Sequence, residues 1–166
     1  MKKYTQAEFD ALLRDEGGVK ICPAGDYTEV KSFGAECSFG PGCDFGAWCS
    51  FGAGCSFGER CSFGAGCSFG ERCSFGAWCS FGEQCDFSAG CVCEFGVFTN
   101  MLTAGGFDSK GRTTYFFKMK DETINVRCGG FAGTFDEWAA QVRKPHRESR
   151  LARLFLLLIP AIRAFF

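Results

Sequence analysis

Residues 49–82 read CSFGAGCSFGERCSFGAGCSFGERCSFGAWCSFG, in which a cysteine and a phenylalanine each recur at every sixth position. The period continues on both sides, so that ten phenylalanines and ten cysteines follow it between Phe33 and Cys91. A run of thiols suggests metal or redox chemistry, whereas a run of aromatic rings suggests a core. The direction in which these side chains point decides between the two interpretations.

A six-residue period matches neither the 3.6-residue turn of a helix nor the two-residue alternation of a long strand. Within each unit, however, Cys-Ser-Phe alternates as a three-residue strand does, which predicts inward cysteine, outward serine and inward phenylalanine. Glycine and two variable residues then turn the corner, and we expect this glycine to supply the unusual backbone angles. Each buried ring would add about 1.5–3 kcal/mol of stability, and cysteine is small enough for the narrower inward position.

Written from the aromatic residue, the unit Phe-Gly-x-x-Cys-Ser resembles the hexapeptide repeat of left-handed parallel β-helices, over residues 32–91. That family usually carries Leu, Ile or Val where this chain has Phe. The resemblance implies triangular coils of about 18 residues, stacked at the strand spacing of ~4.8 Å. We therefore predict a mainly β protein. It comprises an N-terminal helix with capping strands (1–31), a short left-handed parallel β-helix of about three coils (32–96), and a C-terminal β-hairpin with amphipathic helices (97–166).

The two ends carry local signals of their own. Thr5 and Glu8 have the spacing of a capping box, which predicts a short helix through about Leu13. Near the C-terminus, RTTYFFKMK and INVRCGGF flank a turn and predict a hairpin, and Thr134 with Glu137 predicts a second capped helix.

Residues 111–146 are also similar to a small domain of uncharacterised phage and prophage proteins. Those proteins often show Cys-Gly-Cys-Phe where this chain has Cys128-Gly129-Gly130-Phe131. The resemblance implies a phage-like origin and no known chemistry.

The even spacing of the cysteines disfavours the chemistry that thiols usually perform. A zinc site needs four converging ligands, often in C-x2-C pairs, and the only close pair here is Cys91 and Cys93. Thirteen cysteines are an odd number, and the opening residues lack an apolar signal segment, so we expect reduced thiols in the cytoplasm. A catalytic thiolate needs an accessible, electropositive pocket, which an aromatic core does not offer. We predict no metal and no cofactor.

An enzymatic alternative stays open. Many left-handed β-helix proteins are acyltransferases that use a histidine between adjacent subunits, but the one histidine here, His146, lies beyond the repeats. No catalytic residue can therefore be transferred from that family onto residues 32–91. An atypical transferase would have to use His146 as its general base.

The variable corner residues are the best candidates for binding. Residues 1–96 carry a net charge of −6 (seven Lys/Arg against thirteen Asp/Glu), and residues 97–166 carry +5 (eleven against six). Tryptophan at a solvent-facing corner is typical of interface anchors, although each ring could instead pack under a terminal segment. An 18-residue coil would also place Arg60 under Trp78, in cation–π range. The predicted partner-binding residues are Trp48, Trp78, Arg60, Arg72, Glu59 and Glu71.

These observations favour a non-enzymatic phage or prophage protein that binds a host protein complex in the host cytoplasm, such as a defence complex, and inhibits it. A structural module that forms a trimer or another homo-oligomer is the alternative besides the transferase. The basic C-terminal helix, with Arg147, Arg150 and Arg153 on one face, would dock on its own domain or on a second subunit. Contact of that helix with nucleic acid or an anionic membrane is a less favoured hypothesis.

Overall fold

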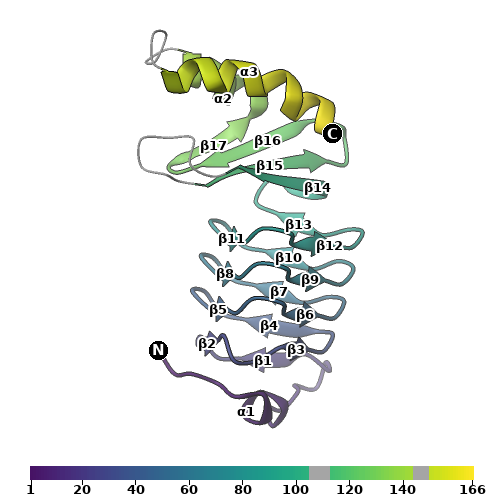
Figure 1. Cartoon of the computed structure of the whole chain (residues 1–166). Coiled ribbons are helices and arrows are strands. Elements are labelled where there is room, and N and C mark those ends of the chain that lie inside the picture. Colours follow the sequence, from purple (N-terminus) through teal and green to yellow (C-terminus); the bar gives the residue numbers. More distant parts are fainter. Residues whose placement is uncertain (105–112, 144–149) are drawn as a thin grey trace. The chain divides into compact units, whose positions relative to one another are not determined.

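The computed structural model describes residues 1–104, 113–143 and 150–166, and it divides the chain into two compact units, Met1–Val97 and Phe98–Phe166. The first unit is a parallel β-solenoid of about four turns (Figure 1). Each turn adds one short strand to each of three sheets, which we name after their first strands. The β1 sheet holds β1 (Lys20–Cys22), β4 (Cys37–Phe39), β7 (Ser56–Phe57), β10 (Ser74–Phe75) and β13 (Val92–Cys93). The β2 sheet holds β2 (Asp26–Tyr27), β5 (Asp44–Phe45), β8 (Ser62–Phe63) and β11 (Ser80–Phe81). The β3 sheet holds β3 (Ser32–Phe33), β6 (Ser50–Phe51), β9 (Ser68–Phe69) and β12 (Asp86–Phe87).

The strand register confirms a coil of 18 residues. Ser56 pairs with Ser74 and Phe57 with Phe75, and the same offset recurs in all three sheets. The solenoid has one turn more than the hexads alone predict, because Lys20–Phe33 already form a turn. In that turn β1 pairs in parallel with β4, so the strands predicted to cap the solenoid belong to it.

The phenylalanines fill the bore in three columns, as the alternation predicts. Rings 18 residues apart are stacked, with centroids 4.5–5.3 Å apart and planes within 10° of parallel. From Phe39 to Phe87, rings six residues apart meet edge to face at 4.9–5.2 Å. Both arrangements are favourable for aromatic quadrupoles and add to the gain from burial.

The glycine after each phenylalanine serves close approach rather than unusual backbone angles, so our expectation for it was wrong. Positive φ occurs instead at the residue before each cysteine. A Cβ atom on the glycine after Phe would lie 2.4–2.7 Å from a backbone atom of the preceding turn, which forbids any side chain. This holds at Gly46, Gly52, Gly58, Gly64, Gly70, Gly76 and Gly82.

The cysteines point inward and complete the hydrogen bonding of the coil. In each hexad the backbone N–H groups of glycine, the residue before cysteine, and serine donate to the neighbouring turns, for example Gly52 N to Phe33 O at 2.9 Å. The glycine carbonyl is left over, and a cysteine thiol 21 residues further along donates to it at 3.3–3.5 Å. Cysteine is thus both a small apolar residue and a donor to a partly buried carbonyl.

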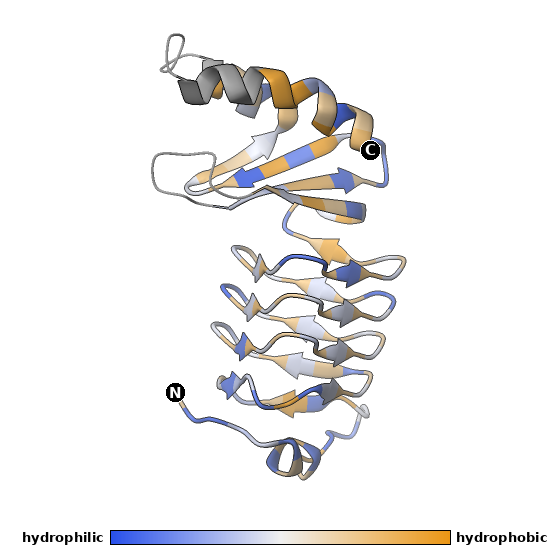
Figure 2. Ribbon diagram, viewed as in Figure 1, coloured by the Kyte–Doolittle hydropathy of each residue, from blue (hydrophilic) through white to orange (hydrophobic). Residues whose placement is uncertain are grey.

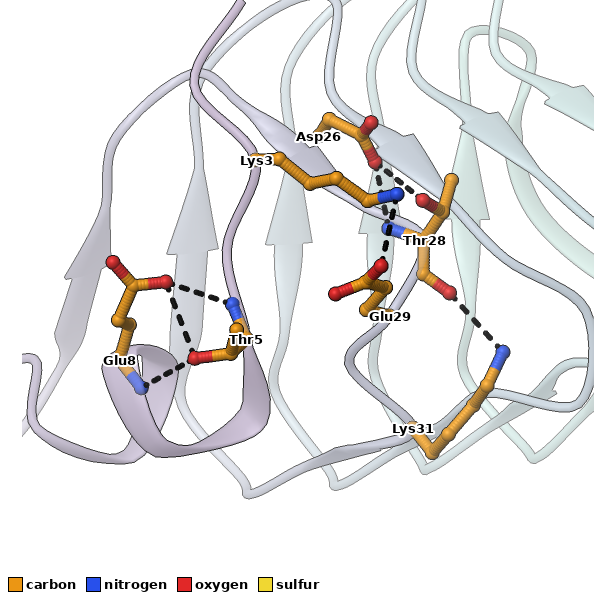
Figure 3. A network of polar contacts seen from close by, with 7 residues as sticks. All are labelled: Lys3, Thr5, Glu8, Asp26, Thr28, Glu29 and Lys31. Atoms are coloured by element: carbon orange, nitrogen blue, oxygen red, sulfur yellow. Dashed lines mark hydrogen bonds and ion pairs between the residues drawn. The ribbon is translucent and has the colours of Figure 1, made fainter.

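Residues 1–14 close the first turn of the solenoid. The short helix α1 (Gln6–Asp10) starts at the predicted capping box of Thr5 and Glu8 and ends three residues before Leu13 (Figure 3). Its one buried residue, Phe9, meets Phe33 edge to face at 4.8 Å and so plugs the bore.

Each strand edge of the first turn is also covered. Backbone bridges join Lys3 to Asp26 and Arg14 to Lys20, which covers β2 and β1. The Gln6 side chain covers β3 in the manner of a peptide group, because its Nε2 donates to Ser32 O at 2.9 Å and its Oε1 accepts from Ser32 N at 3.2 Å. Covered edges do not offer a template to another strand.

The second unit is an antiparallel sheet packed against two helices. Its strands are β14 (Gly96–Ala104), which starts in the first unit, β15 (Thr114–Met119), β16 (Ile124–Cys128) and β17 (Phe131–Thr134). The pairing of β15 with β16 confirms the predicted hairpin, and Thr134 and Glu137 form the second predicted capping box, at α2 (Phe135–Arg143). Hydrophobic residues dominate the described part of α3 (Arg150–Phe165; Figure 2). The core joins the sheet to both helices through Phe116, Val126, Phe135, Trp138, Ala139, Ile159 and Ile162.

The columns of stacked rings predict that substitutions at neighbouring positions of the hexad differ greatly in their effect on the free energy of unfolding. Phe57→Ala should lower the free energy of unfolding by about 3–5 kcal/mol, because it removes a stacked ring from a closed bore. Ser56→Ala, one residue away and outward-facing, should change it by less than about 0.5 kcal/mol. Urea unfolding followed by circular dichroism measures both, and equal effects would contradict the core assignment.

The edge covering predicts a role for Gln6 beyond the helix. Gln6→Ala should leave the β3 edge open and cost about 1–2 kcal/mol of stability, with concentration-dependent association visible by light scattering. Asp10→Ala is the control, since the Asp10 side chain accepts from Gln6 Nε2 on the exposed side of α1, and its backbone contact with Lys20 Nζ survives the substitution. Association of both variants to the same extent would argue against edge covering as the cause.

Candidate functional site

The ten residues that immediately precede the cysteines of the repeat, here called corner residues, share a left-handed backbone conformation with φ of 55–76°. A residue that has a side chain loses about 1 kcal/mol or more of stability when its backbone adopts this conformation, whereas glycine does not. Six of the ten corner residues are nevertheless not glycine: Glu36, Trp48, Arg60, Arg72, Trp78 and Gln84. The backbone of the coil therefore holds these six at defined positions.

The corner residues line three edges of the solenoid, one between each pair of sheets. Gly42, Arg60 and Trp78 lie between the β1 and β2 sheets, and Trp48, Gly66 and Gln84 lie between the β2 and β3 sheets. Glu36, Gly54, Arg72 and Gly90 lie between the β3 and β1 sheets.

The predicted partner-binding residues are consequently spread over all three edges. Trp78 shares one edge with Arg60 and its neighbour Glu59, and Arg72 shares another with Glu71. Trp48 lies alone on the third. The cation–π contact expected between Arg60 and Trp78 is not among those that the described residues form.

Trp48 is the most exposed aromatic residue of the solenoid, at 69%, and Trp78 is 40% exposed. The Trp48 ring lies over Gly66 of the next turn, where a Cβ atom would come within 2.3 Å of Trp48 Cε3. Glycine at position 66 therefore provides the space that the indole occupies. The ring is held against the coil, with much of its surface open to solvent.

The two exposed tryptophans border the same sheet. Trp48 follows β5 and Trp78 precedes β11, and both strands belong to the β2 sheet. This relationship follows from the 18-residue coil, because Asp44, Ser62 and Ser80 are 18 residues apart and so lie in one sheet. The outward side chains between the two edges form one row: Asp26, Asp44, Ser62 and Ser80.

The acidic end of this row is locally ordered (Figure 3). Asp26 Oδ1 accepts hydrogen bonds from Thr28 Oγ1 at 2.6 Å and from Thr28 N at 2.9 Å, and these bonds lower the pKa of the carboxyl group. Asp44 Oδ1 accepts a hydrogen bond from Ser62 Oγ. Nearby, Lys3 Nζ pairs with Glu29 Oε1 at 3.0 Å.

The thiols are poorly placed for chemistry. All thirteen cysteines are free, and eleven of them are buried. Contacts with the thiols of Cys37 and Cys73, together with burial, raise the pKa of Cys55, and a contact with Cys61 together with burial raises that of Cys43. Within the described residues, no three His, Cys, Asp or Glu side chains converge as metal ligands.

The second unit carries a shallow pocket of about 350 Å³. Glu122, Phe135 and Asp136 contribute to its lining, and Arg163 contacts Asp136 across it. His146 and Arg147 lie outside the described residues, as do the side chains of Arg150 and Arg153. Over the described ranges, no helix is long and apolar enough to cross a membrane.

Together these features define a parallel β-solenoid protein with a filled bore and variable residues on its outer edges. No protein-family model, curated protein or solved structure matches the chain. Sequence reasoning found the tryptophans but missed Asp26, Asp44 and Gly66 as their neighbours. The signal was present in the 18-residue offset, which aligns Asp26 with Asp44 and Trp48 with Gly66.

Burial predicts that most thiols are unreactive in the folded chain. With a disulfide-exchange reagent at pH 8, we expect fast reaction of about two thiols, Cys85 and Cys128, because these are only partly buried, whereas the other eleven are buried and out of reach of the reagent. Unfolding in guanidinium should expose all thirteen. Mass spectrometry of the labelled peptides identifies the sites, and early labelling of Cys55 or Cys61 would contradict the filled bore.

Proposed function

We propose that this chain is a non-enzymatic binding protein that acts through protein–protein contacts at the outer edges of its solenoid. The observation that carries the proposal is the Trp48 ring, which lies over Gly66 and remains 69% exposed. All the other aromatic rings of residues 32–91 except Trp78 and Phe87 are buried. A rigid, exposed indole is typical of an interface anchor, since it loses little conformational entropy on binding.

The charged corner residues fit the same role. Arg60 and Arg72 each follow a glutamate at an edge, so charge complementarity could set the orientation of a partner around the tryptophan anchors. The arrangement suits recognition better than catalysis, because the inward-pointing residues of the repeat are phenylalanines and buried thiols.

We propose further that the chain is a phage or prophage protein, wound as a left-handed β-helix. It would act in the host cytoplasm by blocking a host protein complex, such as a defence complex. The similarity of residues 111–146 to phage proteins supports this origin, and the period and pattern of the hexads support the winding. The host target is inferred by analogy with accessory phage proteins.

The proposal predicts that a host protein is captured through the tryptophans. Tagged protein should retain one stoichiometric partner from a nuclease-treated bacterial lysate at moderate salt, identified by mass spectrometry. The double variant Trp48→Ala, Trp78→Ala should lose at least about tenfold in recovery, because truncation of an aromatic anchor costs roughly 2 kcal/mol or more. Leu13→Ala is the matched control, since Leu13 is an 86% exposed apolar residue away from the corners.

Other outcomes would favour the alternatives. A clean homo-oligomer without a host protein, or capture that is unchanged in the double variant, would contradict the proposal. The first result would favour a trimerisation module. A transferase activity that disappears in His146→Ala would favour the enzyme.

A further inference from the structure

We propose that the outer face of the β2 sheet is a docking surface for an arginine- and lysine-rich segment of a partner protein. This inference rests on the proposed function and names the partner's chemistry. The β2 sheet is the one sheet of the solenoid that both exposed tryptophans border, Trp48 from one edge and Trp78 from the other. Trp48 and Trp78 are 30 residues apart, or about 1.7 turns of the 18-residue coil, so their backbone positions are offset by roughly 8 Å along the solenoid axis.

The surface between the two rings offers oxygen atoms as hydrogen-bond acceptors. Its outward row consists of Asp26, Asp44, Ser62 and Ser80, one per turn. Each aspartate uses Oδ1 within the chain, through Thr28 and Ser62 respectively. Among the described residues, Oδ2 of both carboxylates accepts no hydrogen bond, so each can still bind an incoming donor.

The cationic groups near the row already have partners on the chain. Lys3 pairs with Glu29, and Lys31 Nζ donates to the carbonyls of Thr28 at 3.2 Å and Ala47 at 2.9 Å. The positive charges of Lys3 and the N-terminal amine lie close enough to offset part of the charge of Asp26, but residues 1–97 as a whole carry −6 (seven Lys/Arg against thirteen Asp/Glu). This charge favours a cationic partner and steers its approach.

Arginine suits both components of the surface. A guanidinium group stacks on an indole face and forms charge-assisted hydrogen bonds with a carboxylate. The other two faces do not combine two bordering tryptophans with an outward row that holds two aspartates. The outward row of the β1 sheet in the repeat is Ser38, Ser56 and Ser74, without a carboxylate, and the β3 sheet has Asp86 but is bordered only by Trp48.

The chain itself supplies a matched pair of variants. Asp44 and Asp86 occupy the same position of the hexad, on the β2 and β3 sheets respectively. Asn at position 44 can still accept the hydrogen bond from Ser62, so Asp44→Asn removes charge with little structural change. Asp86→Asn removes the same charge from a different face of the same unit.

Fluorescence anisotropy of the full chain with labelled peptides tests the proposal. The peptide (Arg-Gly-Ser)4 should bind at least about tenfold more tightly than (Glu-Gly-Ser)4. Asp44→Asn should weaken binding about three- to tenfold, and Trp48→Ala by a similar factor with partial recovery in Trp48→Phe. Asp86→Asn should change it by less than about twofold.

Equal losses in Asp44→Asn and Asp86→Asn would overturn the inference, because they would show general attraction to an acidic unit. Absence of peptide binding would overturn it as well. Trp48-dependent binding of the neutral oligosaccharide chitohexaose, without preference for the arginine peptide, would replace it with a glycan surface. Capture of a host protein that is lost in Trp48→Ala but retained in Asp44→Asn would leave the proposed function intact and remove only this inference.

Discussion

The stacked phenylalanine rings impose the constraint on which the rest of the solenoid depends. Parallel strands of successive turns lie ~4.8 Å apart, which is also a favourable separation for stacked rings. Rings of one column are 4.5–5.3 Å apart, and the columns meet edge to face, so both contacts of each ring are favourable in the same coil. Three rings per turn fill the bore, and the turns must then lie close together. This is why seven of the phenylalanines, Phe45 to Phe81, are followed by a glycine, at which a Cβ atom would collide with the preceding turn.

The same constraint explains why the thiols are structural. Close stacking partly buries the glycine carbonyls, and an acceptor that is fully buried without a donor costs about 1–3 kcal/mol. The cysteine thiols donate to these carbonyls while occupying little volume, which valine or alanine could not do. A pattern that resembles a metal or redox array therefore contributes hydrogen bonds to the fold. The variation that can carry function is confined to the corners and to the outward row of each sheet.

The six-residue period was sufficient to predict the coil, the inward phenylalanines and cysteines, and the parallel sheets, because these follow from side-chain alternation and from the resemblance. Both capping boxes and the hairpin of β15 with β16 could also be predicted, since their signals are local in sequence. The number of turns could not be predicted, because the segment Lys20–Cys22 does not follow the hexad pattern and yet pairs with Cys37–Phe39 as an additional turn. Positive φ was expected at the glycine after phenylalanine but occurs at the residue before cysteine. Glycine is required after phenylalanine because it lies close to the preceding turn, a tertiary contact that backbone propensity does not predict. The face shared by Trp48 and Trp78 could have been predicted as well, because the 18-residue coil places Asp44, Ser62 and Ser80 in one sheet between the two corners.

The distribution of large corner residues bears on what kind of partner the solenoid can accept. Along two edges a large residue alternates with glycine, as in Glu36, Gly54, Arg72 and Gly90, and the large side chain lies over the glycine of the next turn. Neighbouring corners are only ~4.8 Å apart, and the third edge is where two large residues, Arg60 and Trp78, occupy neighbouring turns. Exposed apolar residues are therefore spaced apart instead of forming a continuous patch. Obligate oligomers usually bury large, mainly hydrophobic interfaces. The spaced anchors of this solenoid fit a partner that is recognised through a few aromatic and charged contacts, which favours a binding protein over a trimerisation module.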